Sequence, residues 1–239
     1  MESLDMQHQM MGYDRSATMF SPDGHILQVE YAEKTVRLGT SSIGIVCSDG
    51  VLIISDKRII DKLIVHGSLN KIQEIDDHII ASAAGILSDA RILTERAQLV
   101  AQQHKLTYDT PVDVLSIIKD IANIKQQYTQ HPGVRPFGVA FMVAGVDSDI
   151  GLFVSDITGN YAEYHAVAIG ENDDKIKDEL RKRYRRDMSI EEALKLGLEI
   201  FKEVQAKDFN VDKFDAAYVN KKDKKIVRLN GEQLKKFVK

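Results

Sequence analysis

The sequence predicts an α+β fold of four layers, αββα, in which two stacked sheets carry helices on both outer faces. Two groups of strand-like segments are each followed by a pair of helix-like segments, the order that this layout needs. The chain has 239 residues, a length that one core can serve, and neither a linker nor an internal repeat divides it, so we expect one domain over residues 1–239. The pattern alone leaves open a mixed α+β domain of another layout, and the length leaves open two smaller domains.

The composition excludes several classes of protein. Apolar residues make up 44% and charged residues 28%, as in ordinary globular proteins, and a net charge of -4 provides no basic field for nucleic acid. No apolar run approaches the roughly 20 residues that cross a bilayer, and the N-terminus lacks the basic flank and apolar core of a secretory signal. We therefore expect a cytoplasmic protein that binds neither nucleic acid nor membrane.

Metal, cofactor and common hydrolase motifs are also missing from the sequence. Cys47 is the only cysteine and lies in an apolar run, where a buried strand thiol is expected rather than a nucleophile. The seven histidines show no HExxH spacing, Ile45 stands where a phosphate loop needs its lysine, and GxSxG is absent. We expect no metal, no cofactor and no nucleophile elbow.

The N-terminal part is expected to form a tail, a turn and a helix. Residues 1–12 are polar and without a period, which is typical of a mobile tail. Ser21-Pro22-Asp23-Gly24 has the composition of a turn. The helix is expected within residues 23–38 and ends before Gly39. Its apolar positions recur three and four residues apart: Ile26, Val29, Ala32 and Val36.

The first strand group follows and contains a hairpin turn at Asp49-Gly50. Its strand-like runs are Ser42–Ser48, Val51–Asp56, Ile72–Ile75 and Ile79–Ala83. Two long helices come next, the second after the helix-starting Pro111. Their apolar residues keep helical spacing: Leu93, Ala97, Val100 and Ala101, then Val114, Ile118, Ile121 and Ala122.

The second half has the same order of strands and helices. Its strand-like runs are Val139–Ala144, Leu152–Val154 and Tyr161–Ala166, and its helices are Asp173–Arg185 and Ser189–Val204. Ser189 and Glu192 form a capping box that fixes the start of the last long helix. Two closing strands and a short terminal helix complete the prediction: Phe214–Asn220, Ile226–Leu229 and residues 231–239.

Three N-terminal motifs resemble, in order and spacing, the signature of proteasome α-type subunits: Tyr13-Asp14-Arg15, Phe20-Ser21-Pro22-Asp23-Gly24-His25 and Gln28-Val29-Glu30-Tyr31-Ala32. Later matches extend the likeness over nearly the whole chain: Asp56-Lys57-Arg58, Gly85, Ser88-Asp89-Ala90-Arg91, Gln126–Gln130 and Gly133–Gly138. Archaeal α subunits are the most similar in character. The resemblance implies the αββα sandwich of N-terminal-nucleophile hydrolases, in agreement with the pattern above.

The resemblance also decides how possible catalytic residues are interpreted. In the related β subunits a threonine freed at the N-terminus attacks the peptide carbonyl, its α-amino group is the base, and a lysine and an aspartate tune the pair. Thr40, Lys71 and Asp56 match these places. The α signature before Thr40 implies that the preceding residues are retained, which leaves its nitrogen an amide. We expect no catalytic residue and no enzyme activity, and an uncleaved catalytic β-type threonine peptidase precursor is the alternative, because Gly39 precedes Thr40.

In the family, seven α subunits form a ring at each end of a barrel, with pockets between neighbours for the C-terminal tails of an activating ATPase or another activator. Lys71 is the first candidate for this pocket, because its ammonium can meet the terminal carboxylate of a tail. Gly39 and Ile86 match further positions of the pocket. Glu33 departs from the basic residue that is usual at its position, and Glu171-Asn172 replace the serine and glycine of a catalytic relative.

Four further residues match the cluster that holds the N-terminal gate open in the family: Tyr13, Asp14, Pro22 and Tyr31. The N-terminal helix is expected to cross the top of the sandwich and to pair with its counterparts in the ring. The implied function is a non-catalytic α-ring subunit of the 20S proteasome core. It would assemble with other α subunits and with β subunits, gate the passage of substrate into the proteolytic chamber and dock activators.

Overall fold

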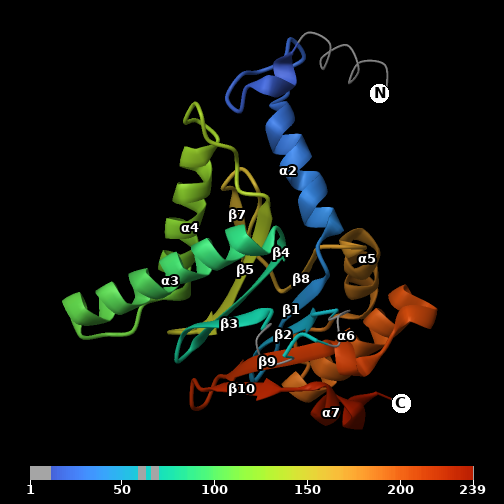
Figure 1. Ribbon diagram of the computed structural model, residues 1–239. Coiled ribbons are helices and arrows are strands. Elements are labelled where there is room, and N and C mark those ends of the chain that lie inside the picture. Colours follow the sequence, from blue (N-terminus) through green and yellow to red (C-terminus); the bar gives the residue numbers. More distant parts are fainter. Residues whose placement is uncertain (1–11, 59–62, 66–69, 239) are drawn as a thin grey trace.

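Two five-stranded antiparallel sheets form the middle of the molecule (Figure 1). The computed structural model describes residues 12–58, 63–65 and 70–238, so the tail predicted over residues 1–12 lies outside the described residues apart from Gly12. The strand order is β10-β9-β2-β1-β8 in one sheet and β3-β4-β5-β6-β7 in the other. Helices cover the outer faces of both sheets, and the predicted α+β sandwich is confirmed.

The first sheet is built around the predicted hairpin at Asp49-Gly50. Cys47 donates its N–H to the carbonyl oxygen of Gly50 over 2.7 Å, and the strands then pair from Val46 opposite Val51 to Ser42 opposite Ser55. The strands of this sheet are β1 (Ser42–Val46), β2 (Gly50–Asp56), β8 (Ala166–Ile169), β9 (Phe214–Asn220) and β10 (Ile226–Leu229).

The second sheet has β3 at one edge and β7 at the other. Its strands are β3 (Ile72–Asp76), β4 (Ile79–Gly85), β5 (Val139–Val146), β6 (Ile150–Ser155) and β7 (Tyr161–Glu163). β5 is buried along its whole length, which is the burial expected of a strand covered on both faces.

Strand β2 shows how the core is divided between the layers. Successive side chains of a strand point to opposite faces. Val51 and Ile53 accordingly belong to the apolar cluster between the two sheets, whereas Leu52 and Ile54 belong to the cluster under the helices of the outer face. A third cluster lies under the helices that cover the second sheet.

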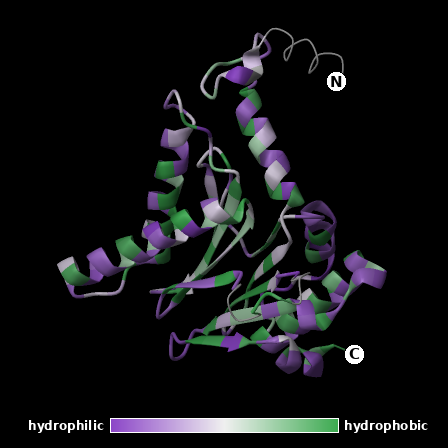
Figure 2. Cartoon of the chain, viewed as in Figure 1, coloured by the Kyte–Doolittle hydropathy of each residue, from purple (hydrophilic) through white to green (hydrophobic). Residues whose placement is uncertain are grey.

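The outer layers consist of two pairs of helices. α3 (Leu87–Tyr108) and α4 (Val114–Tyr128) cover the second sheet, and α5 (Asp173–Arg183) and α6 (Ile190–Gln205) cover the first. Side-chain caps start two of these helices. Asp113 accepts from the Ser116 N–H, and the predicted capping box of Ser189 and Glu192 is present. Hydrophilic and hydrophobic residues alternate along these helices, as expected for an outer layer (Figure 2). The chain ends with α7 (Gly231–Leu234) and a 3-10 turn, Lys235–Phe237.

The N-terminal helix α2 (Leu27–Leu38) extends from the short 3-10 helix η1 (Tyr13–Arg15) to the start of β1 (Figure 1). It begins at Leu27, later than the predicted range 23–38, because residues 21–24 form a turn. The Gly24 N–H donates to the carbonyl oxygen of Ser21 over 2.9 Å, and Gly24 adopts a φ of 83°. Two buried residues of the helix pack on Ile157: Val29 and Ala32.

The strand predicted over Tyr161–Ala166 is wrong, because two strands of different sheets occupy this region. β7 pairs with β6 of the second sheet, whereas β8 pairs with β1 of the first. The change of sheet occurs between adjacent residues. Tyr164 donates its N–H to the carbonyl oxygen of Leu152, and His165 accepts from the N–H of Val46, each over 2.8 Å.

Candidate functional site

Lys71 stands immediately before β3, and its amine reaches across to the first sheet. Nζ donates to the carbonyl oxygen of Thr40 and, over 2.6 Å, to the Thr40 hydroxyl. The carbonyl oxygens of Ser41 and Asp56 each lie 3.3 Å away. These four acceptors are uncharged oxygens, so the hydrogen bonds satisfy the N–H donors of Lys71 without neutralising a positive charge.

The surroundings of Lys71 disfavour that charge. Burial lowers the pKa of Lys71 to about 7. The Asp56 carboxylate opposes this shift, whereas the Arg58 guanidinium makes a smaller contribution that also lowers the pKa. The amine therefore exchanges between its charged and neutral forms near neutral pH. An anion that reached Nζ would favour the charged form.

Thr40 links α2 to β1, and its nitrogen takes part in the peptide bond with Gly39. The Gly39 N–H donates to the carbonyl oxygen of Val36 over 3.0 Å and so ends the helix. The carbonyl oxygen of Gly39 accepts from the Glu171 N–H over 2.8 Å, and the Ser41 hydroxyl donates to the carbonyl oxygen of Glu171. An amide nitrogen shares its lone pair with the carbonyl and cannot serve as a general base.

The loop that carries Glu171 lies directly on the Gly39–Thr40 peptide. Gly170 has a φ of 97°, and a Cβ at this position would lie 2.7 Å from the carbonyl oxygen of Thr40. Glycine is thus needed both for the backbone conformation and for the close approach. The residues that replace the serine and glycine of a catalytic relative, Glu171-Asn172, therefore belong to the loop that covers the threonine.

Asp56 ends β2, and its carboxylate is buried. Oδ1 accepts from the backbone N–H of Arg58 over 2.9 Å. Oδ2 accepts from the Arg58 guanidinium over 3.2 Å and from the Gln205 side-chain amide over 2.9 Å. The same guanidinium forms a 2.8 Å ion pair with Glu171. The carboxylate of Asp56 is therefore engaged by donors other than Lys71, which contacts only the backbone oxygen of Asp56.

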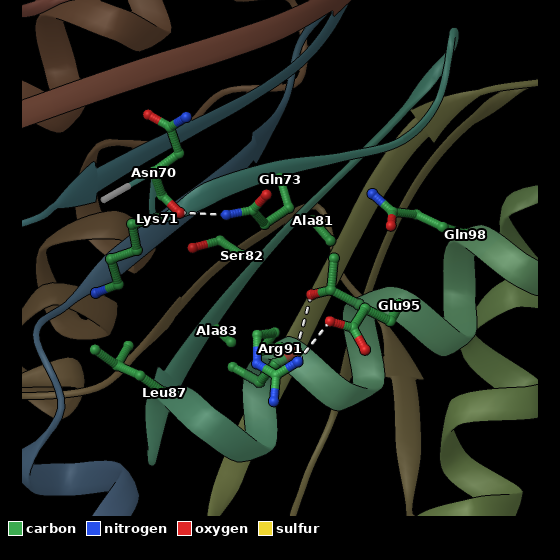
Figure 3. Close-up of a pocket in the computed structure, with 12 residues that line it drawn as sticks. Asn70, Lys71, Gln73, Ala81, Ser82, Ala83, Leu87, Arg91, Glu95 and Gln98 are labelled. Carbon is green, nitrogen blue, oxygen red and sulfur yellow. Dashed lines mark hydrogen bonds and ion pairs between the residues drawn. The ribbon is translucent and has the colours of Figure 1, made fainter. Parts of the chain in front are cut away.

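A groove of about 410 Å³ runs beside Lys71, between β3, β4 and α3 (Figure 3). Figure 3 shows the Lys71 amine turned away from the Arg91 and Glu95 side of this groove. Arg91 and Glu95 pair with each other over 2.7 Å, and Leu87 is 68% exposed at the mouth. The groove is thus partly apolar, with one compensated ion pair on its wall.

The structure connects the three predicted pocket residues through their neighbours, but neither Gly39 nor Ile86 lines the groove beside Lys71. Lys71 bonds to Thr40, next to Gly39, and Gly39 packs on Gly85, which precedes Ile86. A Cβ on Gly39 would lie 2.3 Å from the backbone nitrogen of Gly85, so this glycine is required for packing within the chain. Ile86 is the N-cap of α3 and lines a cavity of about 140 Å³ together with Tyr31.

The four predicted gate residues lie on η1, on the following turn and on the first half of α2. Tyr13 is half-buried in η1, and Pro22 is exposed in the turn. Tyr31 is half-buried, and the amine of Lys34 lies 5.2 Å from the centre of its ring. The side chain of Asp14 lies outside the described part of the structure.

Two partners of Asp56 were not predicted from the sequence. Arg58 belongs to the motif Asp56-Lys57-Arg58, but the motif does not show that Arg58 binds Asp56. No sequence pattern indicates Gln205, at the end of α6, as a partner of Asp56. Neither a helix that could cross a bilayer nor a cluster of His, Cys, Asp or Glu side chains that could hold a metal occurs in residues 12–58, 63–65 and 70–238. Glu33 is exposed on α2.

Comparisons with known proteins identify the family of the chain. The family described as "Proteasome subunit" matches residues 36–219, and the family described as the N-terminal signature of the A-type proteasome subunit matches residues 13–34. The proteasome alpha subunit of Archaeoglobus fulgidus is 42% identical over 233 residues, covering 98% of this chain and 95% of the relative. The proteins of the same name from Pyrococcus abyssi and Methanocaldococcus jannaschii are 42% and 41% identical over 227 residues, each covering 95% of this chain and 87% of the relative.

Proposed function

The chain belongs to the proteasome subunit family, as its sequence motifs predict, and on this premise we propose that it is a non-catalytic α-ring subunit of the 20S core. In this role it scaffolds assembly with other α subunits and with β subunits, gates the passage of substrate into the proteolytic chamber and docks activators. We place it in the cytoplasm and expect the whole chain to act as one domain. The α-type signature at residues 13–34 supports the choice of subunit type.

The observation that carries the non-catalytic role is the α-type signature over residues 13–34, which includes much of α2 and stands before Thr40, so that its retention keeps the Thr40 nitrogen in an amide. The chemistry of the related β subunits needs a free amine on the threonine. Cleavage before Thr40 would remove α2, whose Val29 and Ala32 pack on Ile157. The helix is therefore part of the packed structure, and its loss would expose apolar surface.

The docking role is supported by the chemistry of Lys71. Its hydrogen-bond acceptors are uncharged, so a carboxylate at the end of a partner's chain would supply the missing counter-ion. The neighbouring groove of about 410 Å³ could receive the residues before that carboxylate. Gly39, next to Thr40, and Ile86, in the separate cavity of about 140 Å³, are proposed as further contacts of the docked chain.

The gating role rests on the N-terminal segment. Tyr13, Asp14, Pro22 and Tyr31 are proposed to select the open arrangement of a gate formed by residues 1–12. A turn fixed by proline can move as a rigid piece between two arrangements. Pro22 is exposed in this chain, so it is accessible to a neighbouring subunit or an activator.

One observation favours a second candidate, the uncleaved precursor of a threonine peptidase. The Thr40 hydroxyl accepts a 2.6 Å hydrogen bond from Lys71, an arrangement that could also serve a nucleophile. The two candidates differ in what the mature protein contains. A precursor yields a fragment that begins at Thr40 and hydrolyses peptides, whereas an α subunit keeps its N-terminal helix and hydrolyses none.

Intact mass combined with particle size tests both candidates on the purified protein. We expect an uncleaved chain in ring-sized particles, and a species beginning at Thr40 would overturn the proposal.

In particles reassembled with β subunits, Lys71→Ala should abolish activator-stimulated peptide hydrolysis while assembly persists. The exposed Lys175→Ala serves as the matched control and should leave stimulation unchanged. Full stimulation of the Lys71→Ala particle would exclude Lys71 from the docking pocket.

A further inference from the structure

The carboxylate of Asp56 is bound by Arg58 and Gln205 rather than by Lys71. Both carboxylate oxygens of Asp56 are occupied by the backbone N–H and the guanidinium of Arg58 and by the amide of Gln205, at 2.9 to 3.2 Å. The side chain of Asp56 is 1% exposed, so few other donors can reach it. A buried carboxylate of this kind strongly favours a charged donor.

The backbone of Arg58 adopts an unusual conformation to make these contacts. Its φ is 33°, which lies in the left-handed region that residues other than glycine rarely adopt. Strain of this kind persists only when the surrounding contacts enforce it, and it often marks a functional position. Here the conformation allows the N–H and the guanidinium of the same residue to bind one carboxylate.

Glu171 holds the other side of the guanidinium over 2.8 Å. Arg58 thereby bridges the end of β2 and the loop that covers Thr40. Both side chains of this outer pair are partly exposed, at 36% for Arg58 and 40% for Glu171, so the ion pair is accessible to solvent and weaker than a buried one. Its effect is on the direction of the guanidinium rather than on overall stability.

We propose that Arg58, oriented by Glu171, is a positioning residue that keeps the Asp56 carboxylate away from Lys71 and so leaves the Lys71 amine available to a partner's carboxylate. This inference rests on the docking role of Lys71 proposed above. Without Arg58, the carboxylate of Asp56 would turn toward Nζ, since the backbone oxygen of the same residue already lies 3.3 Å from it. Lys71 would then be paired inside its own chain.

A dependence of docking on pH follows from the same arrangement. The charged groups that act on Lys71 are Asp56 on β2 and Arg58 just after it, and Glu171 of the covering loop pairs with Arg58. Because the pKa of Lys71 is lowered to about 7, its ammonium form is lost as the pH rises through that value. A carboxylate binds the ammonium form, so its affinity should fall above pH 7.

The first measurement follows the pKa of Lys71 itself in the full-length chain. Lysine labelled biosynthetically with 13C, which leaves the amine unmodified, is followed by NMR through its Cε signal between pH 5.5 and 10, and Lys71→Arg assigns the signal. Arg58→Met should raise the pKa of Lys71 by at least about one pH unit, because a nearby opposite charge favours the ammonium form. Asp56→Asn in the same chain should reverse this rise, and Arg58→Lys should restore part of the original value.

A matched variant tests the outer part of the bridge and guards against misfolding. Glu171→Gln keeps the size of the side chain and removes only the charge that orients Arg58. It should raise the pKa of Lys71 in the same direction by a smaller amount, with an unchanged far-UV spectrum. A pKa of Lys71 that stays near 7 in folded Arg58→Met and Glu171→Gln chains would overturn the positioning role.

The second measurement tests docking with a defined probe. An acetylated, leucine-rich heptapeptide with a free C-terminal carboxylate is titrated into the assembled particle, with its C-terminal amide as the control. We expect the carboxylate form to bind and its affinity to fall above pH 7. Below pH 7, where Lys71 is charged in both chains, Arg58→Met should lose about tenfold in affinity because the probe must displace the Asp56 carboxylate, and this factor corresponds to one pH unit in the pKa of Lys71. If the pKa changes occur but the acid and the amide bind equally, the docking role of Lys71 fails while the positioning of Asp56 stands.

Discussion

Lys125 provides a stringent test of the structure, because its amine is buried without a carboxylate partner. It lies in the last turn of α4 and is fully buried. Nζ donates to the carbonyl oxygen of Ser155 over 3.0 Å and to the Ser155 hydroxyl over 3.3 Å. Burial lowers the pKa of Lys125 to about 7, and the nearby Asp156 opposes this only in part.

The direction of the pH effect follows from these values. In the unfolded chain the amine has its ordinary pKa of 10.5, so between pH 7 and 10.5 the unfolded state holds a proton that the folded state does not. The free energy of unfolding therefore rises with pH in this window, by about 1.4 kcal/mol per pH unit for one such lysine. Between pH 7.5 and 9.5 the contribution amounts to about 2.7 kcal/mol.

Lys125→Met removes this titration while it preserves most of the volume of the side chain. The difference in unfolding free energy between wild type and variant should change by about 2.7 kcal/mol from pH 7.5 to pH 9.5, in favour of wild type at the higher pH. Urea unfolding followed by circular dichroism measures both proteins at each pH. The loss of the hydrogen bonds to Ser155 shifts the variant equally at both values, so it cancels from the slope.

The exposed Lys119 of the same helix offers a matched control. Lys119→Gln should leave the pH dependence of unfolding as in wild type. If Lys125→Met also leaves it unchanged, then Lys125 is charged in the folded protein at pH 7.5. In that case its amine must reach solvent or an anion, and the burial of Lys125 would be refuted.

Two further predictions concern close packing. The hydroxyls of Ser42, Ser55 and Ser82 form a buried triangle of hydrogen bonds. Ser82→Ala removes two of these bonds and should lower the free energy of unfolding in urea by about 1 kcal/mol, because Ser42 and Ser55 remain bonded to each other over 2.8 Å. A loss above about 3 kcal/mol would contradict this. Gly39→Ala would bring a methyl group to 2.3 Å from a backbone nitrogen and should lower the melting temperature more than Gly24→Ala, whose Cβ meets nothing within 4 Å and whose cost is the backbone strain at a φ of 83° alone. Equal losses in the two variants would show that the backbone near residue 39 can move apart.

Local features of the sequence were sufficient for most of the secondary structure. The hairpin at Asp49-Gly50 and the capping box of Ser189 depend on residues that are close in sequence, so a local pattern is sufficient to predict them. The strand predicted over Tyr161–Ala166 failed for the opposite reason. Its division between two sheets depends on partners at Leu152 and Val46, which no local pattern contains.

The candidate site shows the same contrast. The resemblance to the family identified Thr40, Lys71 and Asp56 as corresponding to a catalytic set, and the structure places them together. The resemblance did not show that the carboxylate of Asp56 is bound to Arg58 and Gln205 rather than to Lys71. This arrangement depends on the end of α6, about 150 residues further along the chain.

The sequence by itself determined the family and the layered fold and indicated Thr40, Lys71 and Asp56 as candidate site residues, because motifs and hydrophobic periods are contained in neighbouring positions. Only the tertiary structure decided the direction of the pKa shift and the hydrogen-bond partners of Lys71. Burial and the distances between groups set a pKa, and both arise when β2, β3 and the loop after β8 meet.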